Sequence, residues 1–161
     1  MKKLISLILC TLTLFSLAAC GSKSTEKDNT QIPNPFVDCN TLADAAKLAG
    51  FDFIVPDTID GYTERTIQAV DKSMIQVIYS SGEDKQLMLR KGAGSEDISG
   101  DYNTYAETNT VSVGTLKVTM KGENSLVSVA TWTDGDHAYA VEAQTNPISS
   151  DAMSKLIAGI R

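Results

Sequence analysis

Apolar and polar residues alternate strictly along part of this 161-residue chain. Leu116, Val118 and Met120 are separated by single lysine or threonine residues. Because successive side chains of a β-strand point to opposite faces, this spacing gives a strand with one apolar face and one solvated face. Strands of this kind are typical of antiparallel sheets, so the alternation restricts the middle of the chain to antiparallel β-structure.

Further segments with this period follow Phe51, and turn-forming Gly, Asp and Asn residues separate them. The pattern predicts an antiparallel meander of about seven strands, near residues 64–70, 74–79, 86–91, 108–113, 116–121, 126–133 and 137–143. Hairpin turns are expected between strands, at 71–72, 81–84, 114 and 134–135.

Two short helices are predicted, one on each side of the strands. Asn40 or Thr41 is expected to cap the first helix, which Gly50 ends. The second follows Ser149, and its apolar residues form one stripe: Met153, Leu156, Ile157 and Ile160. Both helices are expected to pack on one face of the sheet, which gives an α+β fold in two layers.

The N-terminal segment resembles the leader of a bacterial lipoprotein. Two lysines precede an apolar run over 4–17, and Leu-Ala-Ala-Cys at 17–20 matches the lipobox. We therefore expect residues 1–19 to be removed as a signal peptide and Cys20 to carry a covalent lipid. The apolar run is too short for a transmembrane helix, which needs about 20 residues. The lipid on Cys20 would then hold the protein on the extracytoplasmic face of the cell membrane.

The stretch 20–35 is expected to be a flexible tether, because residues 21–31 include no aliphatic or aromatic side chain. It leads to a single predicted domain over 36–161. The chain holds 14 basic and 20 acidic residues, and loss of the signal peptide removes two lysines and no acid. A surface this acidic argues against nucleic acid and against anionic lipid headgroups as partners.

The cysteines allow no internal disulfide in the mature chain. Cys10 lies in the signal peptide and Cys20 is the anchor, which leaves Cys39. A free cysteine is usually buried, so Cys39 is interpreted as a partly buried residue beside the first helix rather than a nucleophile.

The pattern over 55–160 resembles the bacterial family known as domain of unknown function 4367, which occurs in lipoproteins and in the outer parts of anti-sigma-factor-like membrane proteins. The features that carry the resemblance are Val55-Pro56-Asp57 with Gly61-Tyr62, Ile78-Tyr79, Val113-Gly114 before Val118, Trp132 with Asp134-Gly135 and Tyr139, and Ser-Ser-Asp-Ala-Met from Ser149. The resemblance implies no enzymatic activity and provides no catalytic residue.

Other residue types that carry chemistry have simpler interpretations. His137 with Asp134 and Asp136 could hold a metal, but a hairpin turn at Asp134-Gly135 explains all of these except the histidine, so no metal is expected. Trp132 and Tyr139 are expected in the core. No phosphate-binding glycine loop, zinc cysteine pair, GxSxG or SxxK motif occurs, so we expect neither an enzyme nor a cofactor.

The longest predicted loop, 94–105, is the candidate contact surface. It combines acidic and aromatic side chains that suit an interface: Glu96, Asp97, Asp101, Tyr102 and Tyr105. The alternative is a solvated loop whose tyrosines pack back onto the core.

Two functions therefore stay open. The first is a non-enzymatic accessory or sensor domain that binds another envelope protein. The alternative is a small-ligand or lipid binder, because Met74, Ile78 and Met88 lie on strand faces opposite other apolar residues and need cover. Packing of these three under a helix, with no cavity, would argue against the alternative.

Overall fold

The computed structural model describes residues 34–82, 84–143 and 145–161. The predicted signal peptide, the predicted lipidation site Cys20 and most of the predicted tether lie outside the described residues. Residues 35–161 form one compact unit.

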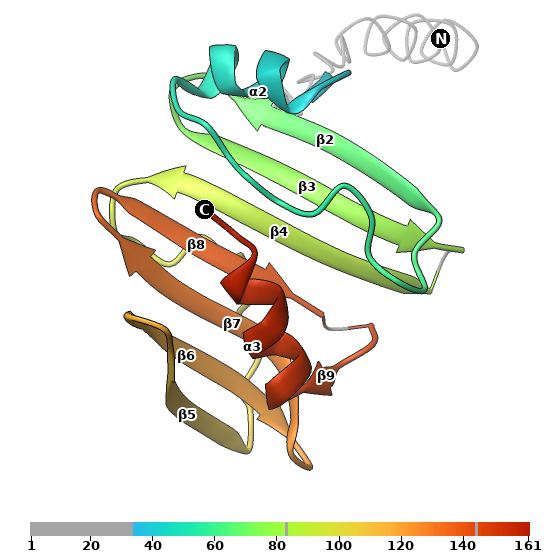
Figure 1. The fold of residues 1–161 in the computed structure, drawn as a ribbon, viewed down its shortest axis with the longest axis vertical. Coiled ribbons are helices and arrows are strands. Elements are labelled where there is room, and N and C mark those ends of the chain that lie inside the picture. Colours follow the sequence, from blue (N-terminus) through green and yellow to red (C-terminus); the bar gives the residue numbers. More distant parts are fainter. Residues whose placement is uncertain (1–33, 83, 144) are drawn as a thin grey trace, which may run out of the picture. The chain divides into compact units, whose positions relative to one another are not determined.

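Within this described part of the chain, nine antiparallel strands form one sheet (Figure 1). Seven of them match the predicted segments, with ends shifted by two residues at most: β2 (Glu64–Val70), β3 (Met74–Ser81), β4 (Lys85–Ala93), β5 (Glu107–Val113), β6 (Leu116–Glu123), β7 (Leu126–Asp134) and β8 (His137–Glu142). The strand count of about seven was too low. β1 (Val37–Cys39) and β9 (Ile148–Ser149) are so short that no alternation could reveal them.

The strand order is β1-β2-β3-β4-β8-β7-β6-β5, with β9 paired to β7. The expected single meander was therefore wrong at one connection, because β4 and β5 are not neighbours. Segment 94–106 instead carries the chain past three strand positions to the far edge, and β5 to β8 then return as a second meander (Figure 1). Thirteen residues can span this distance, since neighbouring strands lie only about 4.8 Å apart.

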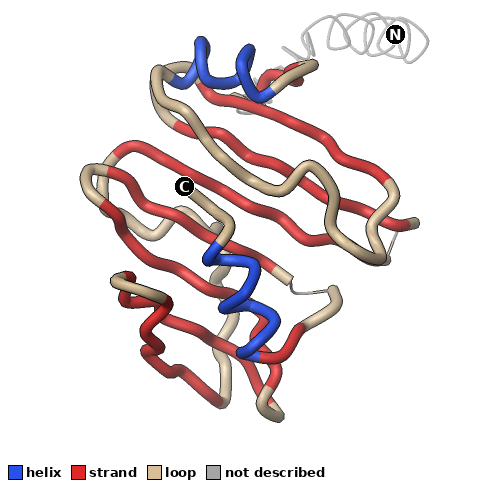
Figure 2. The backbone as a smooth tube through the Cα atoms, in the orientation of Figure 1, coloured by secondary structure: helices blue, strands red, loops and turns tan. Residues whose placement is uncertain are grey.

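The two predicted helices are α2 (Leu42–Ala49) and α3 (Ser150–Ala158). Thr41 caps α2 by accepting a hydrogen bond from the Asp44 backbone N–H at 3.1 Å, and Ser149 caps α3 in the same way. Their placement differs from the expected common layer. Helix α2 packs mainly on β2 and β3, whereas α3 contacts β5, β7 and β9 toward the other end of the sheet (Figure 2).

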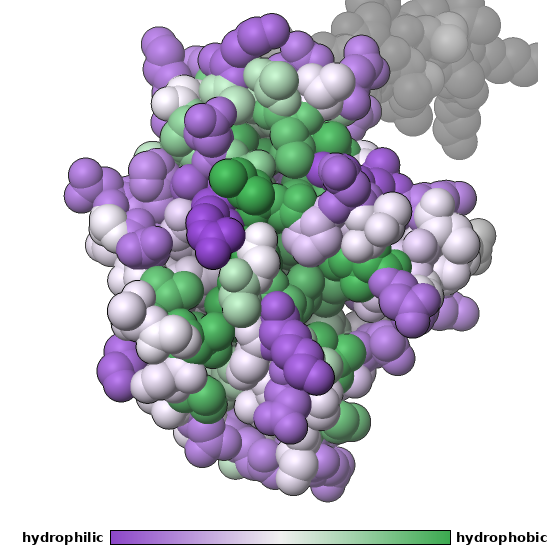
Figure 3. Space-filling model, viewed as in Figure 1, coloured by the Kyte–Doolittle hydropathy of each residue, from purple (hydrophilic) through white to green (hydrophobic). Residues whose placement is uncertain are grey.

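The core lies on one face of the sheet, here named the covered face. Its centre is a row of paired residues that crosses five strands, namely Val77, Leu89, Val141, Ala130 and Met120, all at most 3% exposed. Phe53 and Val55 from the segment before β2, and Met153 and Ile157 from α3, complete this cluster. Figure 3 shows apolar residues along the middle of this side, with hydrophilic residues around them.

The aromatic residues interpreted as core lie in the core. Trp132 stacks on Tyr139 with ring centroids 5.1 Å apart and planes 8° from parallel. Tyr79 donates a hydrogen bond to the Pro56 carbonyl, which fastens the segment before β2, and burial raises the pKa of Tyr79 to about 12. Aromatic packing of this kind accounts for these side chains without a ligand.

The cap at Thr41 gives a first prediction. Thr41→Ala removes the acceptor for the Asp44 N–H, so we expect the free energy of unfolding to fall by about 1 kcal/mol in urea titration. Asn40→Ala is the matched control, since Asn40 was the other cap candidate. An equal loss in both variants would contradict the assignment of the cap to Thr41.

Candidate functional site

The face of the sheet opposite the covered face, here named the open face, carries a polar cluster centred on Arg90. Its guanidinium Nε donates to the Gln76 side-chain oxygen at 2.7 Å, and Nη1 lies 3.2 Å from a carboxylate oxygen of Glu142. These side chains come from β3, β4 and β8. β3 and β4 are consecutive paired strands, and Glu142 joins the cluster because β8 inserts beside β4. The Arg90 and Glu142 side chains are only 16% and 12% exposed.

The same guanidinium fastens segment 94–106, here named the crossover loop. Arg90 Nη1 donates to the Ile98 carbonyl at 3.0 Å and to the Ser99 carbonyl. Side chains that join the loop and the sheet also pack closely against two glycines. A Cβ at Gly92 would lie 3.2 Å from Ile98 Cδ1, and one at Gly100 would lie 2.8 Å from Arg90 Nη1. Gly100 also has φ of +73°, a conformation that other residues rarely adopt.

Two aspartates give the crossover loop its internal order. Asp97 Oδ1 accepts hydrogen bonds from the Ser99 N–H at 2.9 Å and from the Ser99 hydroxyl at 2.6 Å, and its other oxygen lies 3.7 Å from Lys121 Nζ. Asp101 Oδ1 accepts from the Asn103 N–H and side-chain amide at 3.2 and 2.7 Å. The loop is therefore a defined conformation, held by its own side chains and by Arg90.

The five predicted contact residues do not form one patch. Tyr102 is 97% exposed, and Glu96 and Asp97 are also exposed. Tyr105 and Asp101 are partly buried, and burial raises the pKa of Tyr105. The alternative interpretation, in which the tyrosines pack back, therefore applies in part to Tyr105 and not to Tyr102.

The pKa values of Glu142 and Asp97 are shifted in opposite directions. Burial raises the pKa of Glu142 above its usual range, the Arg90 charge opposes this shift, and Asp101 and Asp97 add to it. For Asp97, burial acts in the same direction, but the hydrogen bonds from Ser99 and the Lys121 charge prevail, so its pKa is lowered.

These opposite shifts predict how the stability of variants at the two positions depends on pH. A raised pKa in the folded state means that Glu142 favours folding below its unfolded pKa, and this contribution is lost as pH rises through the folded value. Glu142→Gln has no such loss. We therefore expect the stability of Glu142→Gln relative to the wild type to increase from pH 4 to pH 7, measured by urea titration. Asp97→Asn is the control, and its stability relative to the wild type should change in the opposite direction. The lowered pKa of Asp97 means that its carboxylate stabilises the fold at pH values above the pKa of this group in the unfolded chain.

A groove of about 480 Å³ on the covered face lies between the β5–β6 turn and the end of α3. Lys91 and Tyr139 line it together with the apolar side chains of Val113, Leu116, Ile157 and Ile160. Lys91 is 9% exposed, and its ammonium donates to the Asp52 carbonyl at 2.7 Å. It also lies 5.4 Å and 5.6 Å from the ring centroids of Tyr139 and Phe51, and burial lowers its pKa.

The remaining candidates have ordinary surroundings. The His137 ring packs edge-on against Phe51 at 4.7 Å, and among the described residues no group of three His, Cys, Asp or Glu side chains converges. Cys39 is partly buried against the core, as expected. Met74, Ile78 and Met88 are half-buried on the open face, and neither α2 nor α3, the helices of the described segments, covers them there.

Sequence reasoning missed Arg90, Glu142, Gln76 and Lys91. The available signal was a charged residue within strands that are otherwise apolar on both faces, since such a charge is retained only when it is paired. Which partner it meets depends on strand order, which the alternation did not reveal.

No family model matches the chain, and neither a curated protein nor a solved structure does. The resemblance to domain of unknown function 4367 therefore stays a prediction. Within the described segments, no helix is long and apolar enough to cross a membrane.

Proposed function

We propose that this chain is an extracytoplasmic lipoprotein whose domain binds another envelope protein through the crossover loop. The observation that carries the proposal is the almost complete exposure of Tyr102, at 97%, on a loop that Arg90 fastens to the sheet. A tyrosine offers a large contact area with few rotatable bonds, and a loop that is already ordered loses little entropy on binding. Exposed Glu96 and Asp97 favour a partner surface with basic groups.

The remainder of the proposal concerns attachment and chemistry. The lipobox pattern at 17–20 supports cleavage before Cys20 and a lipid on its thiol. The resemblance to domain of unknown function 4367 supports a binding role without enzymatic activity or cofactor. A lipid anchor would fix the domain near envelope proteins and raise the effective concentration of its partner.

Site-specific photo-crosslinking in intact cells tests the binding proposal. A photoreactive residue at exposed Thr104 is expected to capture a partner, and the same residue at Lys155 in α3 is the control for random encounters. Tyr102→Ser should remove the captured band, whereas Tyr102→Phe, which keeps the ring, should retain most of it. Equal capture from positions 104 and 155, or a band unaffected by Tyr102→Ser, would contradict the proposal.

The groove beside Lys91 supports a second candidate, a small-ligand binder. A site of about 480 Å³ is within the size range of small-molecule pockets, and it combines apolar walls with a buried cation. We expect native mass spectrometry of the chain, mixed with envelope lipid extract, to show an adduct that Lys91→Met weakens and Lys155→Met does not. A spectrum without adducts would exclude this candidate at the extract concentration used.

A further inference from the structure

Strand β5 forms one edge of the sheet, and among the described residues no strand pairs with its outer side. The opposite edge is β1, only three residues long. Edge strands are usually shortened, bulged, or protected by lysine or proline, because their free N–H and C=O groups can pair with another strand. β5 is seven residues long and reads Glu-Thr-Asn-Thr-Val-Ser-Val, so it has none of these protections.

The β5–β6 turn determines which backbone groups of β5 point outward. Val113 pairs with Leu116 across the two-residue turn Gly114-Thr115, and the register continues without a shift to Glu107 and Gly122. The pair that closes such a turn is hydrogen-bonded, and bonded pairs then alternate along the strands. The backbone N–H and C=O groups of Thr108, Thr110 and Ser112 therefore point away from β6.

We propose that β5 pairs with β5 of a second copy of this chain, antiparallel about a twofold axis at Thr110, so that one sheet continues through both copies. In this register Thr110 faces its own equivalent, Thr108 faces Ser112, and all three outward-pointing residues find backbone partners. Cross-strand pairs of threonine and serine are favourable.

The charge distribution suits a second copy. Glu107 is the only charged residue of β5, and it lies opposite Val113 of the other copy. The two Glu107 carboxylates are then separated by about 20 Å along the strands, at roughly 3.4 Å per residue, which is beyond the screening length at physiological salt. No like charges therefore oppose self-pairing of β5.

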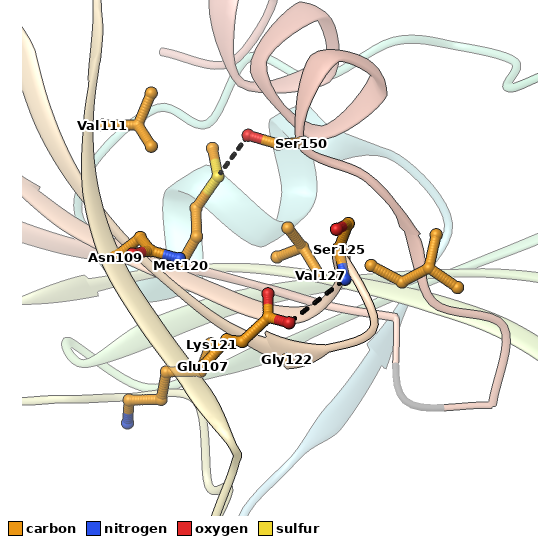
Figure 4. Close-up of a pocket in the computed structure, with 10 residues that line it drawn as sticks. Glu107, Asn109, Val111, Met120, Lys121, Gly122, Ser125, Val127 and Ser150 are labelled. Carbon is orange, nitrogen blue, oxygen red and sulfur yellow. Dashed lines mark hydrogen bonds between the residues drawn. The ribbon is translucent and has the colours of Figure 1, made fainter.

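A groove beside β5 provides apolar surface for the same contact. It has a volume of about 270 Å³ and opens between β5, the β6–β7 hairpin and the start of α3 (Figure 4). Asn109 and Val111 of β5 reach it, as do Met120 and the 42%-exposed Leu126. In the proposed register, Val111 and Val113 of the second copy lie beside Asn109 and Glu107, at the rim of this groove.

Sedimentation equilibrium of the full chain in density-matched detergent tests this pairing. The wild type is expected to show the mass of two chains at high protein concentration. Thr110→Pro removes only an outward N–H, so its pairing with β6 should survive while the dissociation constant of the dimer rises by about tenfold or more. Thr110→Val keeps the N–H and the branched side chain, and is expected to remain a dimer.

Thr110→Lys keeps the test decisive if proline disturbs the strand, because it places two ammonium groups opposite each other without changing the backbone. Circular dichroism and the melting temperature confirm that each variant is folded. A wild type that is monomeric at every concentration, or a folded Thr110→Pro or Thr110→Lys variant that stays dimeric, would overturn the proposal. Neither result would affect the proposed binding through Tyr102, which lies on a different segment.

Discussion

Arg90→Met is expected to lower the free energy of unfolding by about 3 kcal/mol, as is typical when one partner of a buried ion pair is removed. Methionine fills a similar volume but donates no hydrogen bond. The Glu142 carboxylate would lose its contact with Arg90 at 3.2 Å, and the carbonyls of Ile98 and Ser99 would lose the hydrogen bonds from Arg90. Urea titration monitored by circular dichroism measures the change.

The matched control is Lys121→Met, which removes a charge from the same open face. Its ion pair with Asp97 is longer, at 3.7 Å, and the two side chains are 27% and 49% exposed. Pairs as exposed as this contribute at most about 1 kcal/mol. If the two variants lose equal stability, the burial of the Arg90 cluster is not what stabilises the fold.

Arg90 both pairs with Glu142 and holds the crossover loop, and hydrogen exchange tests the second role separately. If the guanidinium fastens the crossover loop, Arg90→Met should speed exchange of the backbone amides over 94–106 more than elsewhere. The same variant should also reduce photo-crosslinking from position 104, although Tyr102 is unchanged, because the loop would need to be ordered on binding. Unchanged exchange over 94–106 would show that the internal hydrogen bonds of Asp97 and Asp101 order the loop by themselves.

The secondary structure could be predicted because its determinants are local. The period-two alternation specified seven strands, and the residues around Thr41, Gly50 and Ser149 specified the helix ends. The strand order could not be predicted in the same way, because it depends on which edges pair across the sheet. One signal pointed to it: residues 138–141 of β8 are apolar or small on both faces, which is typical of a central strand.

The crossover loop was identified as a candidate site from its length, acids and tyrosines. Its attachment was not identified, because Arg90, Gln76 and Glu142 come from three strands whose adjacency follows from the strand order. The glycines carried part of the missing information. At Gly92 and Gly100, an added Cβ would press on the Ile98 and Arg90 side chains that join the loop to the sheet.

Gly122→Ala is expected to have an effect of similar size at a position that the sequence did not mark. The β6–β7 register shifts between Lys121 and Gly122, and a Cβ on Gly122 would lie 1.9 Å from the Leu126 carbonyl oxygen. Because this obstacle is backbone, no side-chain rotation relieves it, and the two strands must move apart. We expect the free energy of unfolding to fall by about 3 kcal/mol and the melting temperature by roughly 10 °C.

Gly114→Ala separates this clash from the conformational preference of glycine. Gly114 has φ of +59° with no atom within 4 Å of an added Cβ, so alanine there should cost only about 1 to 2 kcal/mol, the penalty of a left-handed backbone. A larger loss at Gly122 than at Gly114 would show that close packing of β6 on β7 requires the glycine. Equal losses would show that β6 and β7 can separate at the register shift with little loss of stability. The part of the sheet next to the β5 edge could then change its twist when a second strand pairs with β5.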